Sequence, residues 1–178
     1  MNIALRLLLT LFVAVAIAAC KTTEPAPEPS TDDTTTRAPA PVEVTTAAAL
    51  DPTDYTNKEN FTNPESLLSK NVIYFDFDRS NVKAEYRDIV AAHATYLGSN
   101  SIARVTLEGH ADERGTREYN LGLAERRGNS VTGLLTAGGG SASQLDVVSY
   151  GEERPVCRVS NEDCWWQNRR VEIVYTAR

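Results

Sequence analysis

A break in composition near residue 60 limits where this 178-residue chain can fold. The stretch 21–60 contains ten threonines and six prolines but almost no large apolar side chains. Such a segment cannot bury enough apolar surface to offset the entropy lost on ordering, so we predict a disordered, Thr/Pro-rich acidic linker over 20–60. The remaining residues, 61–178, are enough for one hydrophobic core. We therefore expect a single folded domain over 61–178.

The first nineteen residues have the pattern of a targeting signal. Arg6 precedes a nearly continuous apolar run over 7–19. The run is shorter than the about 20 residues that span a bilayer, so it predicts a cleavable signal peptide. Ile17-Ala-Ala-Cys20 resembles a bacterial lipobox, which implies cleavage before Cys20 and lipidation of that cysteine. Lys21 follows it, and by the same resemblance this favours anchoring in the outer membrane.

The distribution of charge argues against nucleic-acid binding. The residues from Phe61 onward carry 14 basic and 16 acidic side chains, whereas 21–60 carries three basic and eight acidic ones. The net charge of −6 therefore lies mainly in the predicted linker. A domain with nearly balanced charge lacks the basic face that nucleic-acid binding requires. As a flexible coil, about 40 residues span roughly 35 Å, enough to hold a domain clear of a membrane surface.

Hydrophobic periodicity predicts four strands and two helices in the domain. The strands are expected at 71–77, 104–109, 144–150 and 170–175, and the helices at 83–97 and 118–137. The order β-α-β-α-β-β is typical of an α/β (α+β) layer fold with a mixed four-stranded sheet and two main helices on one face. His93 falls on the apolar stripe of the first helix, so we expect a hydrogen-bonded core histidine.

Cys157 and Cys164 lie seven residues apart in an otherwise polar segment that we expect to be a loop. In an oxidising periplasm they can form a disulfide that staples this loop, and two tryptophans follow directly. A zinc site is disfavoured because no histidine accompanies the two cysteines. Asp76–Ser80 opens like a calcium loop, but Asn81 replaces the turn glycine. We expect no metal and no cofactor.

The residues Glu108–Asn120 form a strongly charged segment between the second strand and the second helix. Ligands usually bind at strand-to-helix loops of this kind, although an isolated charged loop is more often a solvated polar loop. Arg127 lies on the apolar stripe of the helix, four residues after Leu123, while Arg126 falls nearer the solvent. A buried guanidinium needs an acidic or anionic partner. Asp112 can reach it, either as a salt bridge or to share a zwitterion, with Asp112 taking an ammonium and Arg127 a carboxylate.

The sequence argues against an enzyme. No serine, threonine or free cysteine stands in a recognisable nucleophile context, and His110 has only His93 as a second histidine in the chain. Asp112 and Glu113 are adjacent and poorly placed to flank a cleft as a hydrolytic pair. A binding domain is the better interpretation.

Several motifs resemble the OmpA-type peptidoglycan-binding domain family. They occur in order over 71–178, at Tyr74–Asp78, Glu108–Thr116, Glu118–Asn120, Arg126-Arg127, Val148–Glu152 and Asn168–Val171. The loop ending in Asp-Glu-Arg-Gly at 112–115 is typical of a lipoprotein branch of this family that works with the Tol envelope system. The resemblance implies the OmpA-like version of the fold predicted above.

The resemblance also implies a ligand and the residues that bind it. The family binds the meso-diaminopimelate stem peptide of peptidoglycan without a covalent bond. The residues of this chain that match its binding positions are Phe77, Asp78, Asp112, Arg114, Leu123 and Arg127. Ala124 and Gly128 depart from the small-residue pair that is more usual around Arg127, which leaves the helix packing there open.

The expected function is that of a non-enzymatic outer-membrane lipoprotein. It would tether the outer membrane to the cell wall as part of the Tol envelope and cell-division system, with its domain in the periplasm. Its implied partners are peptidoglycan, the outer membrane through the lipid on Cys20, and the Tol periplasmic proteins. The alternatives are a protein-interaction hub that mainly docks Tol proteins, and a cell-wall hydrolase.

Overall fold

The computed structural model describes residues 49–178. The predicted signal peptide and residues 20–48 of the predicted linker, which include the predicted lipidation site Cys20, lie outside the described residues. Within residues 49–178, no helix is both long enough and apolar enough to cross a membrane.

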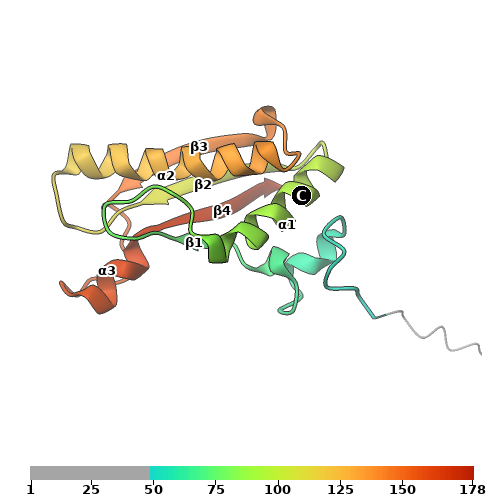
Figure 1. Cartoon of the computed structure of the whole chain (residues 1–178), viewed down its shortest axis with the longest axis horizontal. Helices are drawn as coiled ribbons and strands as arrows, with labels where there is room; N and C mark the ends of the chain where they lie inside the picture. The colour runs from blue at the N-terminus through green and yellow to red at the C-terminus, as the bar shows by residue number, and fades with distance from the viewer. Residues whose placement is uncertain (1–48) are drawn as a thin grey trace, which may run out of the picture. The chain divides into compact units, whose positions relative to one another are not determined.

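A mixed four-stranded sheet forms the centre of the domain (Figure 1). In chain order its strands are β1 (Val72–Tyr74), β2 (Arg104–His110), β3 (Leu145–Gly151) and β4 (Arg170–Ala177). In space the order is β1-β4-β2-β3, with β2 parallel to β3, and with β4 antiparallel to both β1 and β2. The predicted four strands and the mixed sheet are confirmed.

The first strand is shorter than the predicted 71–77. Pairing with β4 continues one residue past the end of β1, where the amide of Phe75 donates to the carbonyl of Arg169 at 2.8 Å. The chain then turns, and Asp78 adopts a positive φ of 55° that is rare outside glycine. Phe77 and Asp78 therefore belong to a loop at the end of the sheet, which is where the pocket described below opens.

Two long helices pack on one face of the sheet, α1 (Arg87–Ser99) and α2 (Arg117–Ala137), as predicted (Figure 1). Thr116 caps α2, because its side chain accepts a hydrogen bond from the amide of Tyr119 at 3.2 Å. Between helices and sheet lies the apolar core, with Phe75, Val90, Leu97, Leu107, Val131, Leu135, Val171 and Ile173 among its buried members. Four 3₁₀ turns complete the described elements: η1 (Lys58–Phe61), η2 (Leu67–Ser69), η3 (Ala84–Tyr86) and η4 (Ala142–Gln144).

His93 is the hydrogen-bonded core histidine that the sequence predicts. Its side chain is fully buried, and Nε2 donates to the carbonyl of Lys70 at 2.9 Å. Because a carbonyl can only accept, Nδ1 is the acceptor of the Tyr175 hydroxyl at 3.1 Å. Burial lowers the pKa of His93 from 6.5 to about 4, so this ring is neutral at neutral pH.

The folded part begins before residue 61, so the predicted boundary is wrong for residues 51–60. Asn60 is fully buried, and its side-chain amide donates to the carbonyls of Asp51 at 2.7 Å and Asp54 at 2.8 Å. Tyr55 packs against the hydrophobic core. The side-chain amide of Asn60 and the ring of Tyr55 connect this segment to the fold. A count of large apolar residues does not predict such contacts.

The cysteine segment contains a third helix, α3 (Glu162–Asn168), where the sequence predicts only a loop. Asn161 caps this helix by accepting from the amide of Cys164 at 3.1 Å. The predicted disulfide between Cys157 and Cys164 is present and joins Cα atoms 5.1 Å apart. A helix of two turns is too short to show a hydrophobic period in the sequence.

Reducing this disulfide should lower the melting temperature of the protein. Closing a loop of about eight residues contributes about 2–3 kcal/mol in the chain-entropy model. Thermal unfolding followed by circular dichroism, with and without reductant, measures the effect. A Cys157→Ser/Cys164→Ser double variant is the control, since reductant should leave its transition in place. An unchanged melting temperature of the native protein on reduction would contradict a stabilising role.

Helix α2 lies against β2 at a very short distance, and Gly109 makes this possible. A Cβ atom on Gly109 would lie 2.2 Å from the carbonyl oxygen of Ala124, which is a backbone atom that cannot rotate away. The contact therefore fixes how close α2, which carries Arg127, lies to the end of β2.

Gly109→Ala should consequently destabilise the domain by about 1–3 kcal/mol or more, the usual range for overpacking. Gly133→Ala is the matched control, because a Cβ atom at that exposed position of α2 meets no atom within 4 Å. It should stabilise the domain by about 0.5–1 kcal/mol, since alanine loses less backbone entropy than glycine in a helix. Urea unfolding of both variants decides the matter, and equal effects at the two positions would show that the Gly109 contact is unimportant.

Candidate functional site

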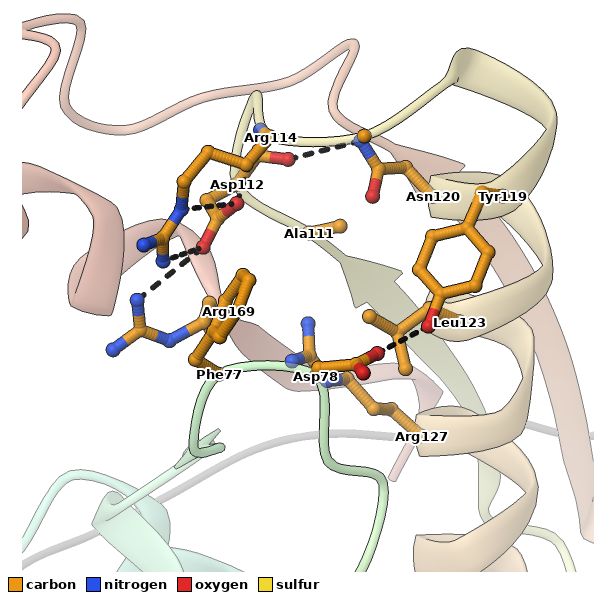
Figure 2. A pocket seen from close by; sticks show the side chains of 11 residues that line it. Phe77, Asp78, Ala111, Asp112, Arg114, Tyr119, Asn120, Leu123, Arg127 and Arg169 are labelled. Atoms are coloured by element: carbon orange, nitrogen blue, oxygen red, sulfur yellow. Dashed lines mark hydrogen bonds and ion pairs between the residues drawn. The ribbon is translucent and has the colours of Figure 1, made fainter.

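A pocket of about 190 Å³ opens at the end of the sheet, between the loop after β1 and the start of α2 (Figure 2). All six residues that the resemblance implies as ligands line it, namely Phe77, Asp78, Asp112, Arg114, Leu123 and Arg127. Their role in binding stays a prediction, but the structure brings them together from three separate segments. The other lining residues are Ala111, Gly115, Tyr119, Asn120 and Arg169.

The guanidinium of Arg127 is fully buried, its hydrogen bonds all go to backbone carbonyls, and its Cζ lies 5.2 Å from the centre of the Phe75 ring. Nε donates to Arg79 at 2.9 Å, Nη1 to His110 at 2.8 Å and Nη2 to Asp76 at 3.1 Å. Burial lowers the pKa of Arg127 to about 10, so the group remains a cation at neutral pH. No ion pair among residues 49–178 involves it. The pocket therefore contains a desolvated positive charge that no carboxylate of the described chain contacts.

Asp112, on the loop after β2, is also buried and is held by two other arginines. Arg114 donates to Asp112 from its backbone amide at 3.1 Å, from Nε at 3.2 Å and from Nη2 at 2.6 Å. Arg169 adds a contact from Nη1 at 3.3 Å. Burial opposes ionisation of Asp112, but these hydrogen bonds outweigh it and lower the pKa below its ordinary value of 3.8. Asp112 is thus a carboxylate at neutral pH.

Asp112 and Arg127 do not form the direct salt bridge that was one of the two possibilities. They lie on opposite sides of the pocket, Asp112 next to Arg114 and Arg169, and Arg127 on α2 (Figure 2). A cation and an anion that face one small cavity from opposite sides can bind a zwitterion, with the ligand carboxylate near Arg127 and the ligand ammonium near Asp112. Arg126, as expected, is exposed and does not line the pocket.

The guanidinium of Arg114 lies between two aromatic rings. Its Cζ is 4.0 Å from the centre of the Phe77 ring and 4.1 Å from that of Trp165. These distances are well within the range of a cation–π contact. Phe77 itself is 54% exposed, so its free surface is open to a ligand at the rim of the pocket.

The opposite rim is formed by polar groups of the β1–α1 loop and the first turns of α2. The hydroxyl of Tyr119 donates to the carboxylate of Asp78. Asn120 donates to the backbone carbonyl of Asp112 at 3.1 Å and to the carboxylate of Glu152. These bonds tie the start of α2 to the loops on either side of the pocket.

Arg169 is the main pocket residue that sequence reasoning missed. It is 6% exposed, and besides Asp112 it bonds the carbonyl of Phe75 at 3.2 Å and the carboxylate of Glu162. In the sequence it stands beside Arg170, which bonds Glu172 within β4 at 2.6 Å. Arg169 directly precedes β4 and ends α3. Its place in the Asn168–Val171 motif was the available signal.

No group of three or more histidine, cysteine or acidic side chains in the part of the chain that the structure describes could hold a metal ion. The pocket instead combines guanidinium, carboxylate, amide and aromatic groups. These groups suit recognition of a small charged organic ligand.

Comparison with known proteins places the chain in a family. The family model described as "OmpA family" matches residues 74–169. A peptidoglycan-associated lipoprotein of Pseudomonas putida is 48% identical over 108 residues, which cover 61% of this chain and 64% of that protein. The Haemophilus influenzae protein of the same name is 44% identical over 105 residues, which cover 59% and 69%. The match to the P. putida relative thus spans less than two thirds of its length.

Solved structures agree with the sequence comparison. The crystal structure of the peptidoglycan-associated lipoprotein from Burkholderia pseudomallei superimposes with a TM-score of 0.64 at 40% identity, over 65% of this chain and 98% of that one. The C-terminal domain of Helicobacter pylori MotB gives a TM-score of 0.55 at 19% identity, over 60% and 84%, which shows a common fold alone. Since the family model covers more than half of the sequence, this chain belongs to the OmpA family, and its curated relatives of high identity are peptidoglycan-associated lipoproteins.

Proposed function

We propose that this protein is a non-enzymatic envelope lipoprotein whose domain binds the diaminopimelate stem peptide of peptidoglycan. The observation that carries the proposal is the guanidinium of Arg127, fully buried at the pocket and bonded only to carbonyl oxygens. Neutral carbonyls satisfy its hydrogen bonds but leave its charge without a counter-charge, so a ligand carboxylate gains a strong interaction there.

The second charge of the ligand is assigned to Asp112. Diaminopimelate in a stem peptide keeps a free ammonium and a free carboxylate on one carbon atom, and this matches a pocket with a carboxylate opposite a guanidinium. Asp112 already accepts four hydrogen bonds, of which the one from Arg169 is the longest at 3.3 Å. An incoming ammonium would replace that contact, because Arg169 keeps its bonds to Phe75 and Glu162.

The attachment to the membrane is a further part of the proposal. Cys20 carries the lipid, the predicted linker supplies the reach, and the pocket holds the wall, so that the outer membrane is tethered to peptidoglycan from the periplasmic side. The names of the relatives, which are peptidoglycan-associated lipoproteins, support this arrangement. We include the periplasmic Tol proteins as partners on the resemblance of the chain to their lipoprotein branch.

Asp112→Asn and Arg127→Lys should each weaken binding of a diaminopimelate-containing tripeptide by roughly ten- to a hundredfold. Asparagine removes the negative charge, whereas lysine keeps a positive charge but loses the fork of donors that binds a carboxylate. Calorimetry with the full chain in detergent measures the affinities. A piece starting at residue 71 is avoided, because the buried Leu68 and Asn60 belong to the fold.

Two matched controls accompany these variants. Arg126→Ala, on the exposed side of α2, should change the affinity less than about threefold, as surface substitutions usually do. Asp78→Asn should cost less than Asp112→Asn, because the carboxylate of Asp78 is exposed and solvent screens it. Melting temperatures confirm that each variant is folded. Equal losses at Arg126 and Arg127 would refute the assignment of the carboxylate site.

The ligand itself offers an independent test. A stem peptide with lysine in place of diaminopimelate lacks the carboxylate assigned to Arg127 and should bind roughly tenfold or more weakly. If both peptides bind equally well to the native protein, Arg127 does not bind that carboxylate.

Sedimentation with intact peptidoglycan separates the function classes. A wall-binding protein sediments with the wall and is released by free diaminopimelate. A hub that mainly docks Tol proteins stays in solution until a protein partner is added, and a hydrolase releases soluble fragments. Soluble muropeptides or an absence of sedimentation would each overturn the proposal.

A further inference from the structure

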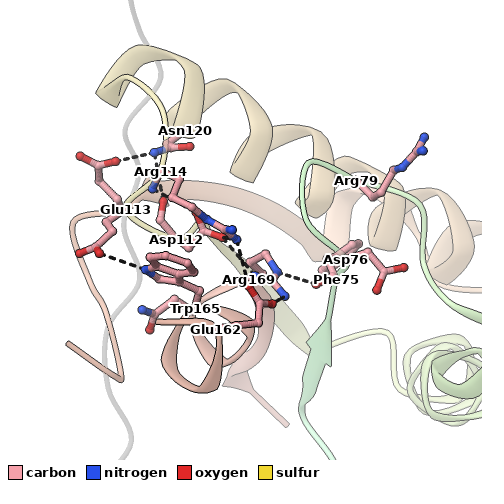
Figure 3. Close-up of polar contacts among 12 residues, drawn as sticks. Phe75, Asp76, Arg79, Asp112, Glu113, Arg114, Asn120, Glu162, Trp165 and Arg169 are labelled. Carbon is pink, nitrogen blue, oxygen red and sulfur yellow. Dashed lines mark hydrogen bonds and ion pairs between the residues drawn. The ribbon is translucent and has the colours of Figure 1, made fainter. Parts of the chain in front are cut away.

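Helix α3 presents two side chains toward the pocket from one of its faces. Glu162 and Trp165 are three residues apart, so they lie one above the other on the helix surface (Figure 3). Neither lines the pocket. Trp165 instead contacts Arg114, and Glu162 contacts both Arg114 and Arg169, the two arginines that bond Asp112.

Trp165 contacts Arg114 through its ring and Glu113 through its indole nitrogen. The centre of its ring is 4.1 Å from Cζ of Arg114, on the side opposite Phe77. Its Nε1 donates to the carboxylate of Glu113 at 3.0 Å. The indole is therefore tied to the 112–115 loop by two different interactions, one to the side chain that bonds Asp112 and one that fixes the orientation of the ring.

Glu162 adds a charged contact from the same face. Its carboxylate accepts a hydrogen bond from Arg169 and lies 3.5 Å from Nη2 of Arg114. The two arginines that bond Asp112 are thus both contacted by α3. The Cys157–Cys164 disulfide fixes α3 in turn, since Cys164 is buried within it.

We infer that Trp165 is a positioning residue, which holds the Arg114 guanidinium over Asp112 and so keeps the binding pocket formed before a ligand arrives. An arginine side chain has many rotamers, and confining it between two rings removes in advance the entropy that binding would otherwise cost. The inference concerns the site of the proposed function and rests on that function only for its ligand-binding measurement.

Trp166 provides a matched control within the same helix. It is the same residue type, adjacent in sequence, and 45% exposed. Its ring packs 5.1 Å from that of Tyr74, on β1, and it makes no contact with Arg114 among those that the structure describes. We expect loss of this side chain to remove a tryptophan from α3 without removing a contact to the guanidinium of Arg114.

The first measurement needs no ligand. NMR follows the exchange with water of the Arg114 Nε–H, which donates to Asp112 in the native protein, and an Arg114→Lys variant assigns the signal. Exchange should be slow in the native chain and in Trp166→Leu, and should accelerate about 2- to 30-fold in Trp165→Leu, the range that loss of one cation–π contact implies. Trp165→Phe keeps an aromatic face and should restore most of the protection.

The second measurement is calorimetry of the same full-length variants with the diaminopimelate tripeptide. Trp165→Leu should weaken binding by about 2- to 30-fold, while Trp165→Phe and Trp166→Leu stay within about threefold of the native protein. If Trp165→Leu does not fold, Trp165→Phe compared with Glu113→Gln and Glu162→Gln tests the same contacts. Glu113→Gln and Glu162→Gln retain the indole and each remove one charge, whereas Trp165→Phe keeps an aromatic face but loses the Nε1 donor to Glu113.

The outcomes distinguish this inference from the proposed function. Slow Arg114 exchange that depends on Trp165 but not on Trp166 supports the positioning role, even where no peptide binds and the proposed function fails. Arg114 exchange that is unchanged in Trp165→Leu, or changed equally in Trp166→Leu, overturns it. Wild-type affinity of a folded Trp165→Leu also overturns it.

Discussion

The guanidinium of Arg127 connects three parts of the chain that are distant in sequence. It rises from α2 and bonds carbonyls of Asp76 and Arg79 in the loop after β1 and of His110 at the end of β2. The arginine donates to all three carbonyls, and the carbonyl of Asp76 also accepts from the amide of Arg79 at 3.2 Å. Removing the charge from water is costly, and only such a complete set of acceptors makes the arrangement stable. The same set of bonds brings the loops around the pocket into place.

The electrostatics of the pocket follow from that arrangement. Three arginines and two aspartates are among the residues that line it. Arg114 and Arg169 share Asp112, whereas Asp78 is bonded to the Tyr119 hydroxyl near the exposed rim. The buried end of the pocket therefore has an excess of positive charge, which the carboxylate of the proposed ligand would balance. We therefore assign the ligand carboxylate to Arg127 and the ligand ammonium to Asp112 because both side chains are buried, and not because of the number of charged residues in the pocket.

Much of this organisation could be predicted from the sequence, because it follows from local patterns. The alternation over 104–109, the helical stripe of α2 and the position of Arg127 on that stripe are properties of short windows, and the structure agrees with each of them. The ordered turns of residues 51–60 could not be predicted in this way, since they depend on the two distant carbonyls that Asn60 bonds. Helix α3 was not predicted for a different reason, because its seven residues are too few to show a hydrophobic period.

In the pocket, too, some features could be predicted from the sequence and others could not. The charged loop and Arg127 indicate a site by residue type and spacing, but the pairing of charges is a property of the folded chain. Asp112 is bonded to Arg114, two residues away, and to Arg169, 57 residues away, and only the second contact requires knowledge of the sheet order. β4 lies next to β1 and β2, which brings the start of β4 beside both loops.

The disulfide-closed segment has a consequence for how such a protein can vary. The sheet, α1 and α2 are bound by contacts as tight as that of Gly109 with Ala124, which leaves little room for change. The segment 152–168 leaves the sheet after β3 and returns to it at β4, and it reaches the pocket through Glu152, which accepts from Asn120, and through the side chains of α3. A change in the length or composition of this segment would therefore act on the pocket through these few side chains and leave the sheet, α1 and α2 as they are.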